Sequence, residues 1–292
     1  MHSLIKNFVI LCDFTFLGTF SAIIQNVLSR WKEYIWFINM KPTPIFTNIK
    51  TGAETYDETN KATYKGITVK TLVFFALTIA AAIAGALFLN RLFDGLDDTN
   101  LKIFIGLIIG AAILSLISAI VGRISYRLAM VFGTIYSLSM GFLLGAITAL
   151  VEKAVPGIGI AAVFGTLIIF AIMLLLFFTG IVKSGKILRA VLIGILLGVL
   201  SLSLFTVVLV LTNAITSTEY LWLLLLIDGL YLIYAVVMLC FNFLEAEAVV
   251  KGGATKQAEW NVALGLMTTL AYIYIELLRI LLIIASIVGN KN

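Results

Sequence analysis

The sequence predicts an all-α integral membrane protein built as a bundle of seven transmembrane helices. Apolar residues make up 62% of the 292-residue chain and charged residues only 12%. Many of the apolar residues fall in runs of about 20, the length that a helix needs to cross the hydrocarbon core of a bilayer. The connections between these runs are short. We therefore expect one membrane domain and no separate soluble domain.

Seven stretches have the required length and apolar character. In chain order they are 69–89, 102–121, 128–150, 158–181, 187–211, 220–244 and 261–288. The segments between them carry turn-forming and charged residues, as in DGLDDTN after the first stretch and EKAVPG after the third. Glycines also recur four residues apart within three of the stretches, which predicts closely packed helices inside the bilayer. These are Gly106 and Gly110, Gly141 and Gly145, Gly194 and Gly198.

Lysine and arginine are unevenly divided between the two sides of the predicted bundle. Most of them lie in the tail before the first span and in the second, fourth and sixth loops, for example at Lys65, Arg123, Arg127 and Lys256. Cationic loops favour the cytoplasmic side. We therefore predict a multi-pass protein of the cell membrane with a cytoplasmic N-terminus and an external C-terminus.

Residues 1–39 do not fit the pattern of the other spans. Their apolar run is interrupted by Asp13, Gln25 and Asn26. It is an eighth, poor span, an interfacial helix, or a segment upstream of a true start at Met40. The predicted organisation is an N-terminal extension over 1–39, a cytoplasmic tail over 40–68 and a membrane domain over 69–292.

Composition also argues against several classes of function. The only cysteines are Cys12 and Cys240 and the only histidine is His2, so neither a disulfide framework nor histidine-based catalysis is expected. No nucleophile–base pair, phosphate-binding glycine loop or zinc motif is visible. We predict that the protein is not an enzyme, holds no cofactor and binds no nucleic acid.

Charged residues inside the predicted spans are few, and such residues are candidates for function. They are Asp228, Glu276 and Arg279, while Glu245 and Glu247 lie at the cytoplasmic end of the sixth span. Glu276 and Arg279 are three residues apart and share a helix face. They form either a structural ion pair or part of a gate. Asp228 either shares a proton with Glu276 or meets water near the outer interface.

Hydroxyl groups in the spans leave a similar choice. They either line a polar path or bond to their own helix backbone. Tyr272 and Tyr274 are further candidates, as donors to Glu276. The hydroxyl residues concerned are Ser137, Ser139, Thr148, Ser201, Ser203, Thr268 and Thr269.

The stretch EWNVALGLMTTLAYIYIELLRILL resembles the end of bacterial proteins of the Bax inhibitor 1/YccA-like family, also called the transmembrane Bax inhibitor motif family, in its Gram-positive branch. Three other stretches agree in order: TYKGITVKT before the first span, GAITALVEKAVPGI around the end of the third, and FNFLEAE closing the sixth. The resemblance extends from about Met40 to the C-terminus. Because MKPTPIFTNIK looks like the beginning of such proteins, it favours Met40 as the true start.

This resemblance implies seven helices around a central last helix and a pH-sensitive calcium leak. It also implies a proton sensor made of two acidic residues near the pore. One matches Glu276. The other falls on Cys240 or Asn242, and neither residue is a carboxylate. Glu245 or Glu247 then replaces it from nearer the cytoplasm, or the protein leaks without control by pH.

The predicted function is a pH-sensitive calcium-permeable leak channel or a proton-linked cation pathway in the lipid bilayer. Calcium prefers oxygen ligands, and Glu276, Glu245 and Glu247 are the predicted transient ligands. A non-conducting regulator of a membrane partner, such as a protease, and a small-solute transporter are the alternatives. The predicted sensor and gate residues are Glu276, Arg279, Glu245, Glu247, Asn242 and Asp228.

Overall fold

The structure, a computed structural model, describes residues 61–93, 98–179, 194–195, 197–199, 201–206, 209 and 217–289. Within these ranges the chain is helical and contains no strand, apart from one isolated antiparallel bridge between Lys61 and Thr255. The named helices are α3 (Tyr64–Phe93), α4 (Asp98–Ile124), α5 (Ala129–Ala154), α6 (Ile158–Phe178), α8 (Ser217–Lys251) and α9 (Lys256–Gly289).

All six of these helices are long and apolar enough to cross a membrane, which confirms six of the predicted spans. The fifth predicted span, 187–211, lies largely outside the described residues, and the residues described within it are helical. The extension over 1–39, the start at Met40 and most of the predicted tail also lie outside the described residues.

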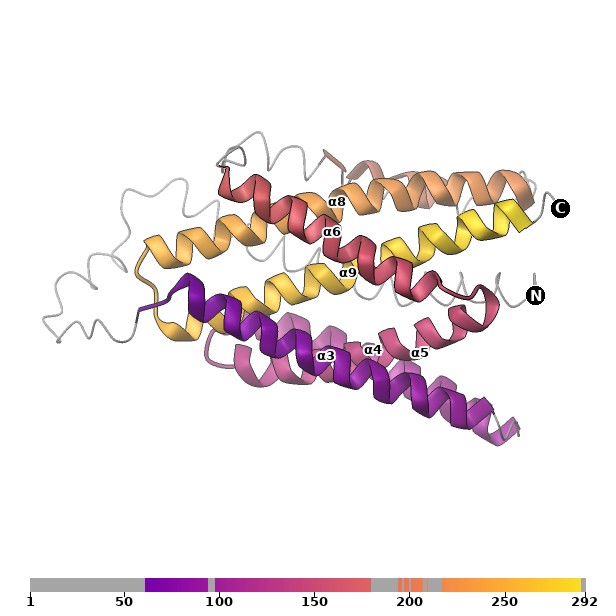
Figure 1. Ribbon diagram of the computed structural model, residues 1–292, viewed down its shortest axis with the longest axis horizontal. Coiled ribbons are helices and arrows are strands. Elements are labelled where there is room, and N and C mark those ends of the chain that lie inside the picture. The colour runs from indigo at the N-terminus through magenta and orange to yellow at the C-terminus, as the bar shows by residue number, and fades with distance from the viewer. Residues whose placement is uncertain are drawn as a thin grey trace, which may run out of the picture.

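The last helix, α9, contacts all of the other five named helices, α3, α4, α5, α6 and α8 (Figure 1). Small residues such as Ala263, Gly265 and Ala271 let neighbours approach it closely, and it buries apolar side chains such as Leu264 and Ile273. Residues of α9 therefore meet several helices at once.

Close packing of α3 against α5 depends on glycines. A methyl group on Gly145 would lie 1.9 Å from the carbonyl oxygen of Ala82, and one on Gly141 would lie 2.4 Å from that of Thr78. The two backbones are therefore in direct contact, which confirms the close approach predicted for this glycine pair. For the Gly106 and Gly110 pair, a methyl group on either residue would meet no atom of another element within 4 Å among the described residues.

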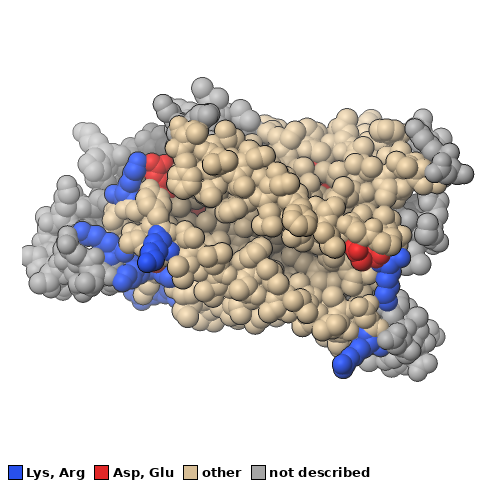
Figure 2. Space-filling model, in the orientation of Figure 1, with Lys and Arg blue, Asp and Glu red and all other residues tan. Residues whose placement is uncertain are grey.

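The outward faces of the bundle are apolar. Large side chains such as Leu72 on α3, Ile113 on α4 and Phe164 on α6 are exposed. The visible middle of the molecule carries almost no charge, and lysines and arginines gather at the end where α3 begins and α8 meets α9 (Figure 2). An uncharged belt between polar ends suits a lipid bilayer.

Candidate functional site

One group of ionisable side chains lies buried between α8 and α9. Nη2 of Arg279 on α9 lies 2.9 Å from Oδ1 of Asp228 on α8, and the two form an ion pair. Glu276 lies one turn before Arg279 on the same face of α9. Asp228 and Glu276 are 0% exposed and Arg279 is 5% exposed, so the protein removes all three charged groups from solvent. We call these three residues the acidic layer.

Two tyrosines border the acidic layer. Tyr231 on α8 interacts electrostatically with all three of its residues. Tyr272, one turn before Glu276 on α9, interacts with Glu276 and Arg279. The hydroxyl of Tyr231 also forms a 3.2 Å hydrogen bond with that of Ser203. Tyr231 thus links α8 by a hydroxyl hydrogen bond to Ser203, which lies within the predicted fifth span.

The acidic layer bears on the alternatives left open by the sequence. Asp228 is fully buried and paired with Arg279, so its side chain does not reach the surface of the protein. A proton shared between Asp228 and Glu276 stays a prediction. The hydroxyl of Tyr274 forms a 2.6 Å hydrogen bond with Thr148 on α5, so this tyrosine is directed toward α5.

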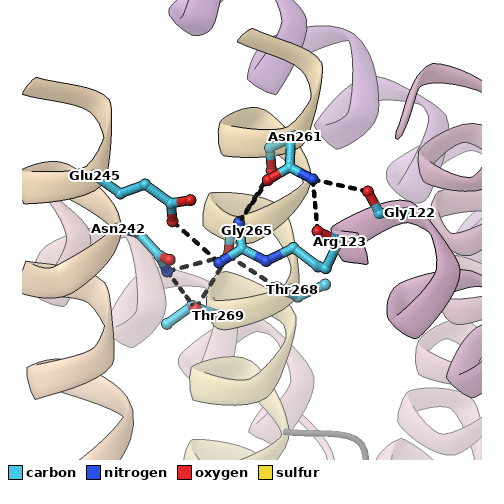
Figure 3. A network of polar contacts seen from close by, with 8 residues as sticks. All are labelled: Gly122, Arg123, Asn242, Glu245, Asn261, Gly265, Thr268 and Thr269. Atoms are coloured by element: carbon cyan, nitrogen blue, oxygen red, sulfur yellow. Dashed lines mark hydrogen bonds and ion pairs between the residues drawn. The ribbon is translucent and has the colours of Figure 1, made fainter. Parts of the chain in front are cut away.

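A second polar group joins α4, α8 and α9 nearer the positively charged end of the bundle (Figure 3). Nη1 of Arg123 donates to the carbonyl oxygen of Asn261 at 3.1 Å, and its Nη2 lies 3.0 Å from a carboxylate oxygen of Glu245. Nδ2 of Asn261 donates to the carbonyl oxygens of Gly122 at 2.8 Å and Arg123 at 3.0 Å. Asn261 therefore satisfies carbonyl groups that the end of α4 leaves without a helical partner.

Asn242 completes this second group from α8. Its Nδ2 donates to the carbonyl oxygen of Gly265 at 3.1 Å and to Oγ1 of Thr269 at 2.6 Å, both on α9. A methyl group on Gly265 would lie 2.4 Å from Nη1 of Arg123 and 3.1 Å from Oδ1 of Asn242. Only glycine leaves room here for both side chains. We call Arg123, Asn242, Glu245, Asn261 and Thr269 the amide layer.

The two layers lie far apart along the helices. α8 and α9 run antiparallel, with Asp228 beside Arg279 and Asn242 beside Gly265 and Thr269. Asn242 lies fourteen residues after Asp228 on α8, which is about 21 Å along the helix axis, whereas Thr269 and Glu276 on α9 are seven residues apart, about 10 Å. On α9, Asn242 therefore contacts Gly265 and Thr269, and the sensor role that the resemblance gives to this position stays a prediction.

The other two predicted carboxylates also lie away from Glu276. Glu245 pairs with Arg123 in the amide layer, and Glu247 pairs with Lys251 one turn further along α8. The structure therefore does not bring Glu276, Glu245 and Glu247 together as calcium ligands. Among the described residues, no three histidine, cysteine, aspartate or glutamate side chains are placed to hold a metal ion.

Hydroxyl groups in the spans mostly bond to their own helix, as one of the two interpretations expected. Ser139, Thr148, Ser201 and Thr268 each donate to a carbonyl oxygen three or four residues earlier. Thr269 also does so, but it accepts a hydrogen bond from Asn242 as well.

One buried carboxylate was not selected from the sequence. Glu259 in the first turn of α9 accepts a 2.7 Å hydrogen bond from the backbone N–H of Thr63 and pairs with Lys70 of α3 at 2.6 Å. Arg123 and Asn261 were likewise not selected as site residues. Two features of the sequence could have indicated these residues. Arg123 lies near the end of an apolar span, and Glu259 and Asn261 are polar residues at the start of the last span.

The fold and the buried polar layers define a class: a helical membrane protein with several spans and ionisable groups enclosed between them. Residues 43–286 match the family model described as Bax inhibitor 1 like, and the chain belongs to this family. The resemblance seen in the sequence is therefore confirmed. Neither the curated proteins nor the solved structures include a match to the chain.

Proposed function

We propose that the protein is a pH-sensitive, calcium-permeable leak channel or proton-linked cation pathway in which the acidic layer is the gate. The observation that carries this proposal is the burial of two carboxylates and one guanidinium between α8 and α9. Buried charges within a membrane bundle are costly and mark ion or proton pathways. Membership of the Bax inhibitor 1 like family supports the same conclusion.

The gate works through the charge balance of this layer. When both carboxylates are ionised, one arginine faces two negative charges, and the layer carries a net charge of −1. A proton bound by Glu276 or shared with Asp228 removes the excess charge and favours close packing of α8 on α9. Loss of this proton creates repulsion in a site of low dielectric constant. The repulsion separates the helices and admits water and cations.

Calcium enters this scheme as the permeant ion. It prefers hard oxygen ligands, and the carboxylates of Asp228 and Glu276 supply them transiently once the layer opens. Glu245 and Glu247 take no part in this step because they pair with Arg123 and Lys251. We propose no enzymatic reaction and no cofactor.

The finer features of the architecture belong to the same proposal. We propose a seven-helix bundle that includes a fifth span over 187–211, with α9 as its centre. The protein lies in the cell membrane with its N-terminus in the cytoplasm and its C-terminus outside. The concentration of lysine and arginine at one end of the bundle supports this orientation.

Calcium flux into proteoliposomes tests the proposal. For the wild type we expect a flux that rises with pH, since deprotonation opens the gate. Glu276→Gln keeps the size of the side chain but carries no charge at any pH. We expect its flux to fall to that of protein-free liposomes. Glu247→Gln is the matched control, because Glu247 forms an exposed pair at the end of α8, and its flux should equal that of the wild type.

Each contrary result has a definite meaning. Normal, pH-dependent flux in Glu276→Gln would show that the gate is not the acidic layer. Absence of flux from the wild type at every pH would favour a non-conducting regulator. Saturable uptake of a small solute without calcium flux would favour a transporter.

A further inference from the structure

The first turns of α3 and α9 meet at one buried carboxylate, Glu259. Its Oε1 accepts from the backbone N–H of Thr63 at 2.7 Å and from the Thr63 hydroxyl at 3.3 Å. Its Oε2 pairs with Lys70 at 2.6 Å. Glu259 is 2% exposed, although it lies near the end of the bundle. We call Thr63, Lys70 and Glu259 the clamp.

The clamp completes the start of α3 with a group from α9. Oγ1 of Thr63 accepts from the backbone N–H of Gly66 at 3.0 Å, as an N-cap residue does. In a capping box, a glutamate three residues after the cap returns a carboxylate to the N–H of the cap residue. Here that position is Gly66, and a methyl group on it would lie 2.3 Å from the Glu259 carboxylate oxygens. Glu259 supplies the missing carboxylate from another helix.

Further contacts tie the same two regions together. The backbone N–H of Ala62 donates to the carbonyl oxygen of Ala254 at 2.8 Å. Nζ of Lys70 donates to the carbonyl oxygen of Lys256 at 2.8 Å and lies 4.9 Å from the centre of the Trp260 ring. The start of α3 is therefore bound both to the loop before α9 and to the first turn of α9.

One member of the clamp and two of the acidic layer lie on one continuous helix. α9 runs without a break from Lys256 to Gly289, so it carries Glu259 near one end and Glu276 and Arg279 further along. A packed helix moves largely as a rigid element. Displacement of α9 at the acidic layer therefore pulls on Glu259, and loss of Lys70 would leave a charge buried without its cation.

From this geometry we infer that Glu259 is a positioning residue: through Thr63 and Lys70 it holds α9, and with it the acidic layer, in the closed arrangement. This inference rests on the proposed function. It assigns regulation of the gate to contacts at the opposite end of the gate helix. Any ligand or modification that loosens the start of α3 would then favour the open state.

The test compares flux and pH dependence in four variants of the full chain. At a pH at which the wild type is closed, we expect Glu259→Gln and Lys70→Met each to raise calcium leak by about fivefold, as loss of about 1 kcal/mol would. Because the closed state is weakened, the pH midpoint of the flux should move to lower pH. The double variant should leak no more than either single variant. Lys70→Arg keeps a cation at this position, so its flux should have the same pH midpoint as that of the wild type.

The matched control is the exposed pair Glu247 and Lys251 in the last turns of α8, just before the loop that leads to α9. Neutralising it with Glu247→Gln and Lys251→Met should leave leak and midpoint unchanged. If Glu259→Gln lowers thermal stability but leaves the pH profile of the flux unchanged, Glu259 is only a structural cap and the inference fails. An equal shift in the control pair would also contradict it, since any charge at this end would then act alike.

A labelling measurement separates this inference from the proposed function. Ile273 is fully buried, one turn before Glu276. We expect a single cysteine at this position, in a chain with Cys12 and Cys240 replaced by serine, to react about fivefold faster with a small thiol reagent when Glu259→Gln is added. If the wild type conducts no calcium, the proposed channel function is rejected. Faster labelling in Glu259→Gln would still support the role of the clamp in that case. Unchanged labelling would overturn it.

Discussion

The acidic layer and the amide layer both join α8 to α9, but they are built from different groups. The acidic layer contains three ionisable residues that are almost completely buried. The amide layer contains one ion pair, Arg123 with Glu245, whose side chains are 11% and 21% exposed. Its other contacts are made by asparagine, threonine and backbone carbonyl groups, which keep one charge state across the physiological pH range.

Under the proposed function, this difference separates a site that responds to protons from one that fixes helix positions. A change in protonation alters the net charge of the acidic layer, and burial makes that change large in energy. The hydrogen bonds of Asn242 and Asn261 need only correct geometry, and they set the register of α9 against α8 and α4. We expect the effects of substitutions on stability to differ between the two layers in size, in pH dependence and in sensitivity to salt.

The largest effect should come from Asp228→Asn. This change leaves the buried guanidinium of Arg279 without its carboxylate at 2.9 Å, and breaking such a pair costs about 3–5 kcal/mol. Denaturant unfolding in detergent would measure the loss. Adding Glu276→Gln and Arg279→Met to Asp228→Asn removes all three buried charges and should recover most of the stability. Wild-type stability in Asp228→Asn alone would show that Arg279 does not depend on Asp228.

A smaller effect is expected from a single methyl group in the amide layer. Gly265→Ala places this group against Arg123 and Asn242, and crowding of this kind costs about 1–3 kcal/mol. Gly229→Ala, next to Asp228, is the matched control. Within the part of the chain that the structure describes, a methyl group there meets no atom of another element within 4 Å, and alanine favours the helix by up to about 1 kcal/mol. Equal unfolding midpoints for the two variants would show that the amide layer tolerates displacement.

The same comparison explains which parts of the molecule the sequence could predict. A run of some twenty apolar residues is a local signal, so six spans were found with ends close to those of the helices. Asp228, Glu276 and Arg279 were selected because charges inside such runs are rare. Their burial follows from the same cost, since a bundle interior is the place where a membrane helix can hold a charge.

Contacts between helices were not predicted, because they depend on register and tilt. The pairing of Asp228 with Arg279 requires the offset between α8 and α9, which sequence spacing alone did not supply. The contacts of Asn242 with Gly265 and Thr269 depend on the same offset. Arg123 resembled a cationic loop residue, and Glu259 an ordinary residue before a span. Neither residue could be recognised from its local sequence, because the partner of each lies on another helix.

The smallest effect in this comparison should come from Glu245→Gln. Arg123 keeps its hydrogen bond to the carbonyl oxygen of Asn261, and its pair with Glu245 is partly exposed. Partly exposed pairs of this kind contribute about 0–1 kcal/mol and are screened by salt. Unfolding of wild type and variant at low and high salt would measure this difference, which should shrink as salt is added. A loss as large as that of Asp228→Asn, and unaffected by salt, would mean that the amide layer also depends on buried charge.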